Sequence, residues 1–165
     1  SFFIGGNASM DVCKMISVDA GLSLINKGQT TKQNYGILSD DYKTIRTTIT
    51  YLEVPVNVRA GFDVGSGKFL IGAGPYIGFA LGGQTKGYTR DINGTLITKN
   101  TDMAFGSGTT EMKSVDFGMN FSLAYKLSNG LGIQAGYGCG LTDLNNIAGI
   151  TSKNKVTSIG LNYTF

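Results

Sequence analysis

The charged residues within the regularly patterned parts of the chain are its candidates for chemistry. Asp19, Glu53, Arg59, Asp116 and Lys126 occupy the polar positions of alternating segments. The sequence has no histidine, which removes the commonest general base and the commonest metal ligand. Serines and aspartates are frequent, but no spacing places a nucleophile beside a base. These charges predict structural ion pairs, with a proton or ion path as the alternative, and no catalytic, metal or cofactor site.

The composition excludes several classes of protein. The 165 residues include 14 Lys and Arg against 11 Asp and Glu, a formal net charge of +3. This excess is too small to indicate nucleic acid as a partner. Charged residues make up 15% of the chain, against roughly 25% in soluble domains. The 25 glycines come with 41% hydrophobic residues, which excludes a disordered chain. A single domain, 1–165, is expected.

Alternation of apolar with small or polar residues is the dominant pattern. From residue 115 to 127 the odd positions carry Val, Phe, Met, Phe, Leu, Tyr and Leu, whereas the even positions carry Asp, Gly, Asn, Ser, Ala and Lys. A period of two predicts β-strands, and no segment shows a helical period of similar strength. Seven strands are expected, at residues 2–12, 16–24, 52–62, 69–82, 115–127, 131–142 and 156–165.

The connections between these strands alternate in length. Those after the first, third and fifth strands are short, whereas those after the second, fourth and sixth are long and polar, at 26–43, 84–113 and 143–154. Short turns at one end and long loops at the other are typical of an up-and-down sheet. The 84–113 segment contains Asn93-Gly94, a strong hairpin signal. It predicts a hairpin that projects beyond the main sheet.

The alternating sheet has two interpretations, which differ in what each face meets. In a soluble barrel the apolar face points inward, whereas in an outer-membrane barrel it meets lipid. The polar positions are largely Gly, Ala, Ser and Asn rather than the Lys, Glu and Thr of a water-facing surface. The small residues at the polar positions and the lack of charge at the apolar positions both favour an all-β, antiparallel, transmembrane up-and-down β-barrel. A soluble lipocalin-like carrier is the alternative.

Four short motifs, in this order, resemble those of the PorT-like outer-membrane β-barrel family. They are YLEVP at 51–55, GPYIG at 74–78, DFG at 116–118 and GLT at 140–142. The resemblance implies an eight-stranded barrel in the outer membrane of a Gram-negative bacterium of the Bacteroidetes type. It also implies that Tyr163 and Phe165 form the signal read by the barrel-assembly machinery. The namesake takes part in protein secretion, a role that does not transfer with the fold.

The expected topology places the C-terminus and the short turns in the periplasm and the long loops outside the cell. Residues 2–12 would then run inward from the cell surface. Seven antiparallel strands cannot close without one parallel seam, and an open edge in lipid leaves backbone groups unpaired. We therefore expect an eighth strand, either ahead of Ser1 or from another chain, to close the barrel.

The interior of such a barrel predicts specific contacts. Asp19 and Arg59 lie at similar heights above the short turns, so we expect them to pair or to share a network across the interior. Glu53, Asp116 and Lys126 are expected to belong to the same interior charge network. An eight-stranded barrel has an interior that side chains fill, which disfavours a diffusion pore. The glycines of 72–82 resemble a phosphate-binding fingerprint, but that fingerprint requires a strand-to-helix turn. Within a strand they would instead admit large interior neighbours such as Tyr51 or Tyr76.

Together these patterns predict a non-enzymatic outer-membrane barrel. Known outer-membrane barrel enzymes rely on histidine, which this chain lacks. The first hypothesis is a structural or accessory subunit of a larger outer-membrane assembly for protein secretion or transport. The second is a module that binds a surface ligand through its external loops, with Tyr88 and Arg90 as candidate contacts. Expected partners are outer-membrane lipid and lipopolysaccharide, the barrel-assembly machinery during insertion, and a larger protein complex.

Overall fold

Strands make up the regular structure of the protein. The computed structural model describes residues 2–34, 42–90, 95–108, 111–144, 146 and 152–164. Within these ranges no helix is long and apolar enough to cross a membrane. The strands are β1 (Phe3–Cys13), β2 (Ile16–Asn34), β3 (Tyr42–Val64), β4 (Gly67–Arg90), β5 (Leu96–Asp102), β6 (Val115–Leu127), β7 (Leu131–Gly140) and β8 (Lys155–Tyr163).

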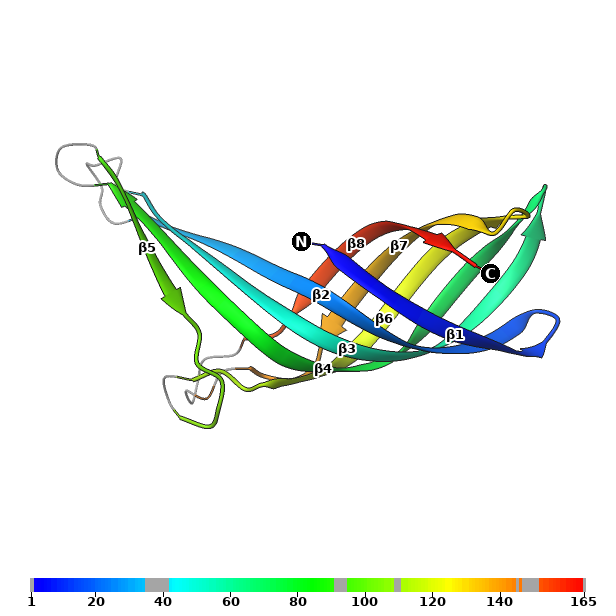
Figure 1. Cartoon of the computed structure of the whole chain (residues 1–165), viewed down its shortest axis with the longest axis horizontal. Coiled ribbons are helices and arrows are strands. Elements are labelled where there is room, and N and C mark those ends of the chain that lie inside the picture. Colours follow the sequence, from blue (N-terminus) through cyan, green and yellow to red (C-terminus); the bar gives the residue numbers. More distant parts are fainter. Residues whose placement is uncertain are drawn as a thin grey trace.

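The strands form one antiparallel sheet that curls into a half-barrel (Figure 1). Its order is β1-β2-β3-β4-β6-β7-β8, and β5 pairs with β4 off this path. Because each neighbour reverses direction, the edge strands β1 and β8 run the same way. They do not pair with each other within the described residues. The start of β1 approaches β8, where the Phe3 ring lies close to Gly160. The seven main strands are present as predicted.

The two faces of the sheet differ in the way that the alternation predicts. Large apolar side chains point away from the hollow, with exposed fractions of 50% for Leu123, 54% for Ile133 and 77% for Leu161. Asn120 and Gln134 occupy the opposite face and are half-buried. An apolar surface this extensive needs lipid or a partner to cover it. The sheet is therefore inside-out relative to a soluble barrel, and the lipocalin-like alternative does not fit it.

The segment after the second strand is a long hairpin rather than a loop. The ladder between β2 and β3 continues as far as Asn34 opposite Tyr42. Residues 44–50 are rich in Thr and Ile, whose branched side chains favour an extended backbone. The prediction of a loop over 26–43 was wrong, because the polarity of this segment marks where the apolar band ends and not where the strands end.

The expected hairpin beyond the main sheet is present. β4 continues to Arg90, and β5 returns beside it from Leu96 to Asp102. The Asn93-Gly94 turn lies outside the described residues. The ends of β2, β3 and β4, together with β5, extend well past the other strands at the left of Figure 1. We call this extension the projecting sheet, and it comprises residues 27–34, 42–50, 82–90 and 96–102.

Short turns join the strands at the opposite end of the sheet. They lie at residues 14–15, 65–66 and 128–130, close to the predicted positions. Gly65 and Gly130 have φ angles of +60° and +86°. Side chains with a Cβ rarely adopt this left-handed region, so glycine permits both turns to be tight.

Candidate functional site

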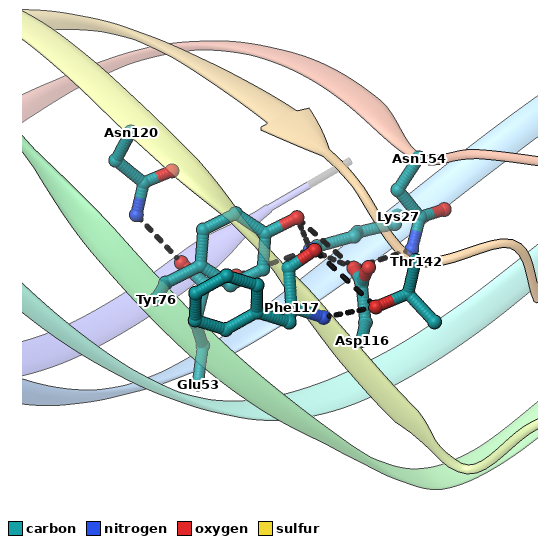
Figure 2. A network of polar contacts seen from close by, with 8 residues as sticks. All are labelled: Lys27, Glu53, Tyr76, Asp116, Phe117, Asn120, Thr142 and Asn154. Carbon is teal, nitrogen blue, oxygen red and sulfur yellow. Dashed lines mark hydrogen bonds and ion pairs between the residues drawn. The ribbon is translucent and has the colours of Figure 1, made fainter.

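Three of the four buried charged side chains among the described residues lie together on the concave face of the sheet (Figure 2). Lys27 Nζ, on β2, lies 2.9 Å from Asp116 Oδ2 on β6 and 3.1 Å from Glu53 Oε2 on β3. The exposed fractions of these three side chains are between 0% and 7%. Buried carboxylates of this kind require a compensating charge, which Lys27 supplies to both.

Two tyrosine rings enclose the same ammonium group. Lys27 Nζ lies 4.4 Å from the centre of the Tyr76 ring and 4.9 Å from that of Tyr51, which are cation–π distances. Lys27 also donates a hydrogen bond of 3.4 Å to the Tyr76 hydroxyl. Both rings are buried. We refer to Lys27, Glu53, Asp116, Tyr51 and Tyr76 as the lysine cluster.

Further hydrogen bonds hold the two carboxylates in place. The Tyr76 hydroxyl donates to Asp116 Oδ2 at 3.0 Å, and the Asn154 side-chain amide donates to the same oxygen at 2.7 Å. Glu53 Oε1 accepts from the Asn120 amide at 3.0 Å. Asn154 lies on the segment that leads into β8, so the cluster connects the two sides of the half-barrel.

Strand register brings these residues together. Glu53 lies opposite Gly78 on β4, and Gly78 lies opposite Asp116 on β6, so one row across three strands carries both carboxylates. Ser23 of β2 lies opposite Glu53 and shares the inward face with Lys27. The long Lys27 side chain reaches back along β2 to this row.

Glycines provide the space that the two tyrosines occupy. A Cβ atom at Gly118 would lie 2.6 Å from the Tyr76 ring, and one at Gly78 would lie 3.4 Å from the Tyr51 ring. The prediction that the glycines of 72–82 admit these large neighbours holds at Gly78, whereas a Cβ at Gly82 would meet no atom within 4 Å, and Gly118 was not part of the prediction. The glycines of 72–82 lie inside β4, so they do not form the strand-to-helix turn of a phosphate-binding fingerprint.

A second ion pair lies nearer the short turns. Arg59 Nε is 2.9 Å from Asp19 Oδ1, without the alignment of a hydrogen bond, and the Asn57 amide donates to Asp19 Oδ2 at 3.3 Å. The predicted pairing of Asp19 with Arg59 is thus present. It joins the neighbouring strands β2 and β3, however, rather than crossing the interior, because Asp19 lies opposite Asn57, two positions from Arg59.

Outward apolar side chains and inward charges are the combination found in outer-membrane barrels. Residues 1–146 match the family described as outer membrane protein beta-barrel domain. The chain belongs to this family. It matches no curated protein and no solved structure.

Lys126 lies apart from the other interior charges of this barrel domain. It is opposite Lys68 near the short turns, and it forms no ion pair with another described residue. The structure therefore does not bring Lys126 into the charge network with Asp19, Arg59, Glu53 and Asp116 that the sequence predicted. Those four residues themselves divide into two groups, one around Arg59 and one around Lys27.

The remaining predicted residues lie away from the lysine cluster. Tyr88 is half-buried on the projecting sheet, and Arg90 ends β4. Tyr163 is exposed at the end of β8. Phe165 lies outside the described residues.

Lys27 is not among the residues that the sequence pattern singled out. The apolar alternation fades after Leu24, which placed Lys27 in an expected loop. One feature of the sequence could have identified it. Asp19, Ser23 and Lys27 all occupy odd positions, so on one continuous strand their side chains point to the same face. Recognition that the threonine-rich 44–50 segment favours a strand would have extended the hairpin to include it.

The surroundings of the cluster define what it can do chemically. Within the described ranges no three His, Cys, Asp or Glu side chains are grouped to hold a metal ion. Lys27 borders two hollows of about 430 Å³ each. The loop-side hollow is also lined by Ile49 and Met103, and the other by Asp19 and Arg59. The lysine cluster therefore separates two hollows and holds its carboxylates on fixed partners.

Proposed function

We propose that this outer-membrane β-barrel domain is a non-enzymatic structural or accessory subunit of a larger outer-membrane assembly. Its C-terminal end and short turns face the periplasm, and its projecting sheet faces the outside of the cell. The observation that carries the proposal is the projecting sheet itself. It continues the barrel wall as a hydrogen-bonded ladder beyond the apolar band, in place of loops.

The construction of the projecting sheet suits contact with another protein. Its backbone pairs run without a break from Thr50 opposite Gly82 to Thr44 opposite Tyr88, and β5 adds a further paired strand. Such a sheet keeps a fixed shape, and its outer edges offer backbone groups for pairing with another chain. A subunit that docks onto a partner gains affinity from this preorganisation.

The interior supports a role that involves neither catalysis nor conduction. The lysine cluster lies between the two hollows, where the rings of Tyr51 and Tyr76 fill the space around Lys27. The interior of a barrel of about eight strands is just wide enough for side chains to fill. The buried carboxylates are held by a lysine, a tyrosine and two amides, which engage them in ion pairs and hydrogen bonds.

The size of the native complex tests this proposal. Envelopes from cells that carry the tagged full chain are solubilised in mild detergent and separated on a native gel. The test variant replaces residues 87–99 by Asn-Gly, which closes a turn on the Lys86–Asn100 pair. We expect the unaltered chain to migrate in a complex several times its own mass, and the variant to migrate alone. Insertion of two glycines at 128–130 is the control and should leave the complex intact.

Two outcomes contradict the proposal. One is migration of the unaltered chain as a free barrel. The other is retention of the full complex by the shortened variant. Heat-dependent migration of each variant on a denaturing gel establishes that the barrel is folded and inserted.

Binding of a surface ligand is the second candidate function. The observation that favours it is the loop-side hollow of about 430 Å³, where Ile49, Met103, Met112 and Leu144 provide apolar walls above Lys27. Hollows of this volume hold small molecules in other proteins. Tyr88, one of the contacts expected from the sequence, is not among the residues that line this hollow. A ligand retained by the purified chain and lost on substitution of Ile49 by Trp would favour this function.

We also assign the chain to the PorT-like group of a Gram-negative, Bacteroidetes-type bacterium. What supports this narrower assignment is that the four motifs lie around one site. YLEVP supplies Tyr51 and Glu53, GPYIG supplies Tyr76, and DFG supplies Asp116. In the GLT motif, the Thr142 hydroxyl accepts a hydrogen bond of 2.9 Å from the backbone N–H next to Asp116 (Figure 2).

We further propose that Tyr163 and Phe165 are read by the barrel-assembly machinery. Tyr163 is exposed on the lipid face at the end of β8, where a partner can reach it. Deletion of Phe165 should lower the amount of inserted barrel in cells without changing the stability of the barrel that does insert. Unchanged insertion would contradict this role.

A further inference from the structure

Basic residues border the loop-side limit of the apolar band beside the starts of β6 and β8. On β8, Ile159 and Leu161 are exposed on the lipid face. Exposure alternates along this strand and places Lys155, its first residue, on the same face. Lys113 and Lys153 are also exposed. We refer to Lys113, Lys153 and Lys155 as the basic rim.

Backbone hydrogen bonds hold the segments of the basic rim side by side. The Lys113 N–H donates to the Leu144 carbonyl at 3.0 Å, and the Leu144 N–H donates to the Ser152 carbonyl at 2.8 Å. Lys153 and Lys155 follow Ser152 on the same segment. The three lysines therefore belong to one continuous stretch of the wall.

Alternation also sets the direction of two rim lysines. Asn154 lies between Lys153 and Lys155 and points inward, where it donates to Asp116. Its two neighbours are exposed, whereas Asn154 is half-buried. Lys153 and Lys155 thus lie on the outward side, although part of each also borders the loop-side hollow.

The positive charge of the basic rim is not neutralised by the described residues. None of the three lysines forms an ion pair with them. Glu111, the carboxylate nearest in sequence to Lys113, accepts a hydrogen bond of 2.8 Å from the Gly108 N–H, and Asp143, the nearest to Lys153, accepts one of 2.9 Å from the Ser152 N–H. At the short-turn end Asp63 lies directly opposite Lys68, and none of Lys14, Lys68 and Lys126 forms an ion pair with a described residue either. Unpaired positive charge above an apolar band complements a lipid with an anionic headgroup.

We propose that the basic rim binds the phosphate groups of an anionic glycolipid, whose acyl chains lie along the lipid face of β6 to β8. This inference rests on the proposed function and orientation. In that orientation the loop end of the barrel lies in the outer leaflet, which contains phosphorylated lipopolysaccharide. The basic rim lies directly beside the apolar band, which favours a lipid over a free anion as the ligand. The rim would bind the headgroup of the lipid, and the apolar band would contact its acyl chains. By the usual contribution of lysines near an anionic surface, three of them strengthen binding roughly a hundredfold.

Native mass spectrometry of the purified full chain with bisphosphorylated lipid A tests the proposal. The variant K113Q/K153Q/K155Q should bind lipid A roughly a hundredfold more weakly than the unaltered chain. The variant K113R/K153R/K155R keeps the charge and should bind normally. The control K14Q/K68Q/K126Q removes three lysines from the short-turn end and should also bind normally. A fourth measurement replaces lipid A by its dephosphorylated form. The unaltered chain should bind this form weakly, with the same affinity that the glutamine variant has for lipid A.

Three results overturn the proposal. Equal binding of phosphorylated and dephosphorylated lipid A excludes phosphate recognition, and this comparison needs no variant. Equal weakening by the glutamine variant and its control excludes a specific rim. Displacement of lipid A by millimolar inorganic phosphate assigns the lysines to a free anion instead. Since binding is measured on the isolated chain, none of these results bears on the larger complex.

Discussion

Lys27 Nζ lies 2.9 Å from Asp116 Oδ2, although 89 positions separate the two residues in the chain. The contact runs from β2 to β6, which are separated in the sheet by β3 and β4. In a flat sheet these residues could not meet, so their contact depends on the curl of the half-barrel. The rings of Tyr51 and Tyr76 fill the space that the curl encloses.

Loss of the Lys27 charge should destabilise the barrel strongly. The change Lys27→Met leaves two buried carboxylates without a compensating charge, which typically costs about 3–5 kcal/mol in the free energy of unfolding. Urea unfolding in lipid vesicles measures this free energy. The control Lys126→Met removes a lysine that forms no ion pair with the described residues, and should cost less than about 1 kcal/mol. Similar losses from the two changes would contradict the central role of Lys27.

The pair of Lys27 and Asp116 should show energetic coupling. In the double variant K27M/D116N both charges are removed together, so its loss of stability should be smaller than the sum of the single losses by about 1–3 kcal/mol. The comparison pair is K27M with Asp19→Asn, which alters the separate ion pair of Arg59. The losses of stability from K27M and Asp19→Asn should be additive to within about 0.5 kcal/mol. Additivity in the first double variant would show that the two residues do not interact.

A methyl group at Gly118 should disturb the packing of Tyr76. The new Cβ would lie 2.6 Å from the ring and closer still to the Cys139 carbonyl oxygen of β7, so the ring or the strands must shift, at a cost of about 1–3 kcal/mol. Gly82 is the matched control on β4, because no atom lies within 4 Å of its Cβ position. Thermal unfolding of Gly118→Ala and Gly82→Ala compares the two sites. A larger loss at Gly82 would contradict the packing argument.

The lipid face should tolerate charge according to depth. Leu123 lies near the middle of β6, where Leu123→Arg should cost about 2–4 kcal/mol in vesicles. Leu131 begins β7 beside a short turn, where Leu131→Arg should cost about 0–1 kcal/mol. Both leucines are exposed on the same face, so only depth differs. Equal costs would show that this face does not meet the bilayer core.

The face of the sheet on which each side chain lies could be predicted from the sequence. Successive side chains of an extended strand point to opposite faces, independently of the strands beside it. This alternation was enough to turn Leu123 and Leu161 toward lipid and to bring Asp19 and Arg59 onto one inner face. A different signal, the Asn93-Gly94 pair, predicted the hairpin of β4 and β5. The length of β2 escaped prediction, because the polar composition around Lys27 resembles that of a loop.

The sequence by itself thus determined the fold class, the lipid face and the inward residues of the seven predicted strands, but not Lys27. The tertiary structure decided which inward residues meet. The height of a residue along the barrel depends on the register and stagger of the strands. These shifts accumulate from strand to strand and cannot be read from the sequence of any one strand. For this reason Lys27 joins Glu53 and Asp116 from three strands, whereas Lys126, on the same strand and face as Asp116, lies beside Lys68 at the other end.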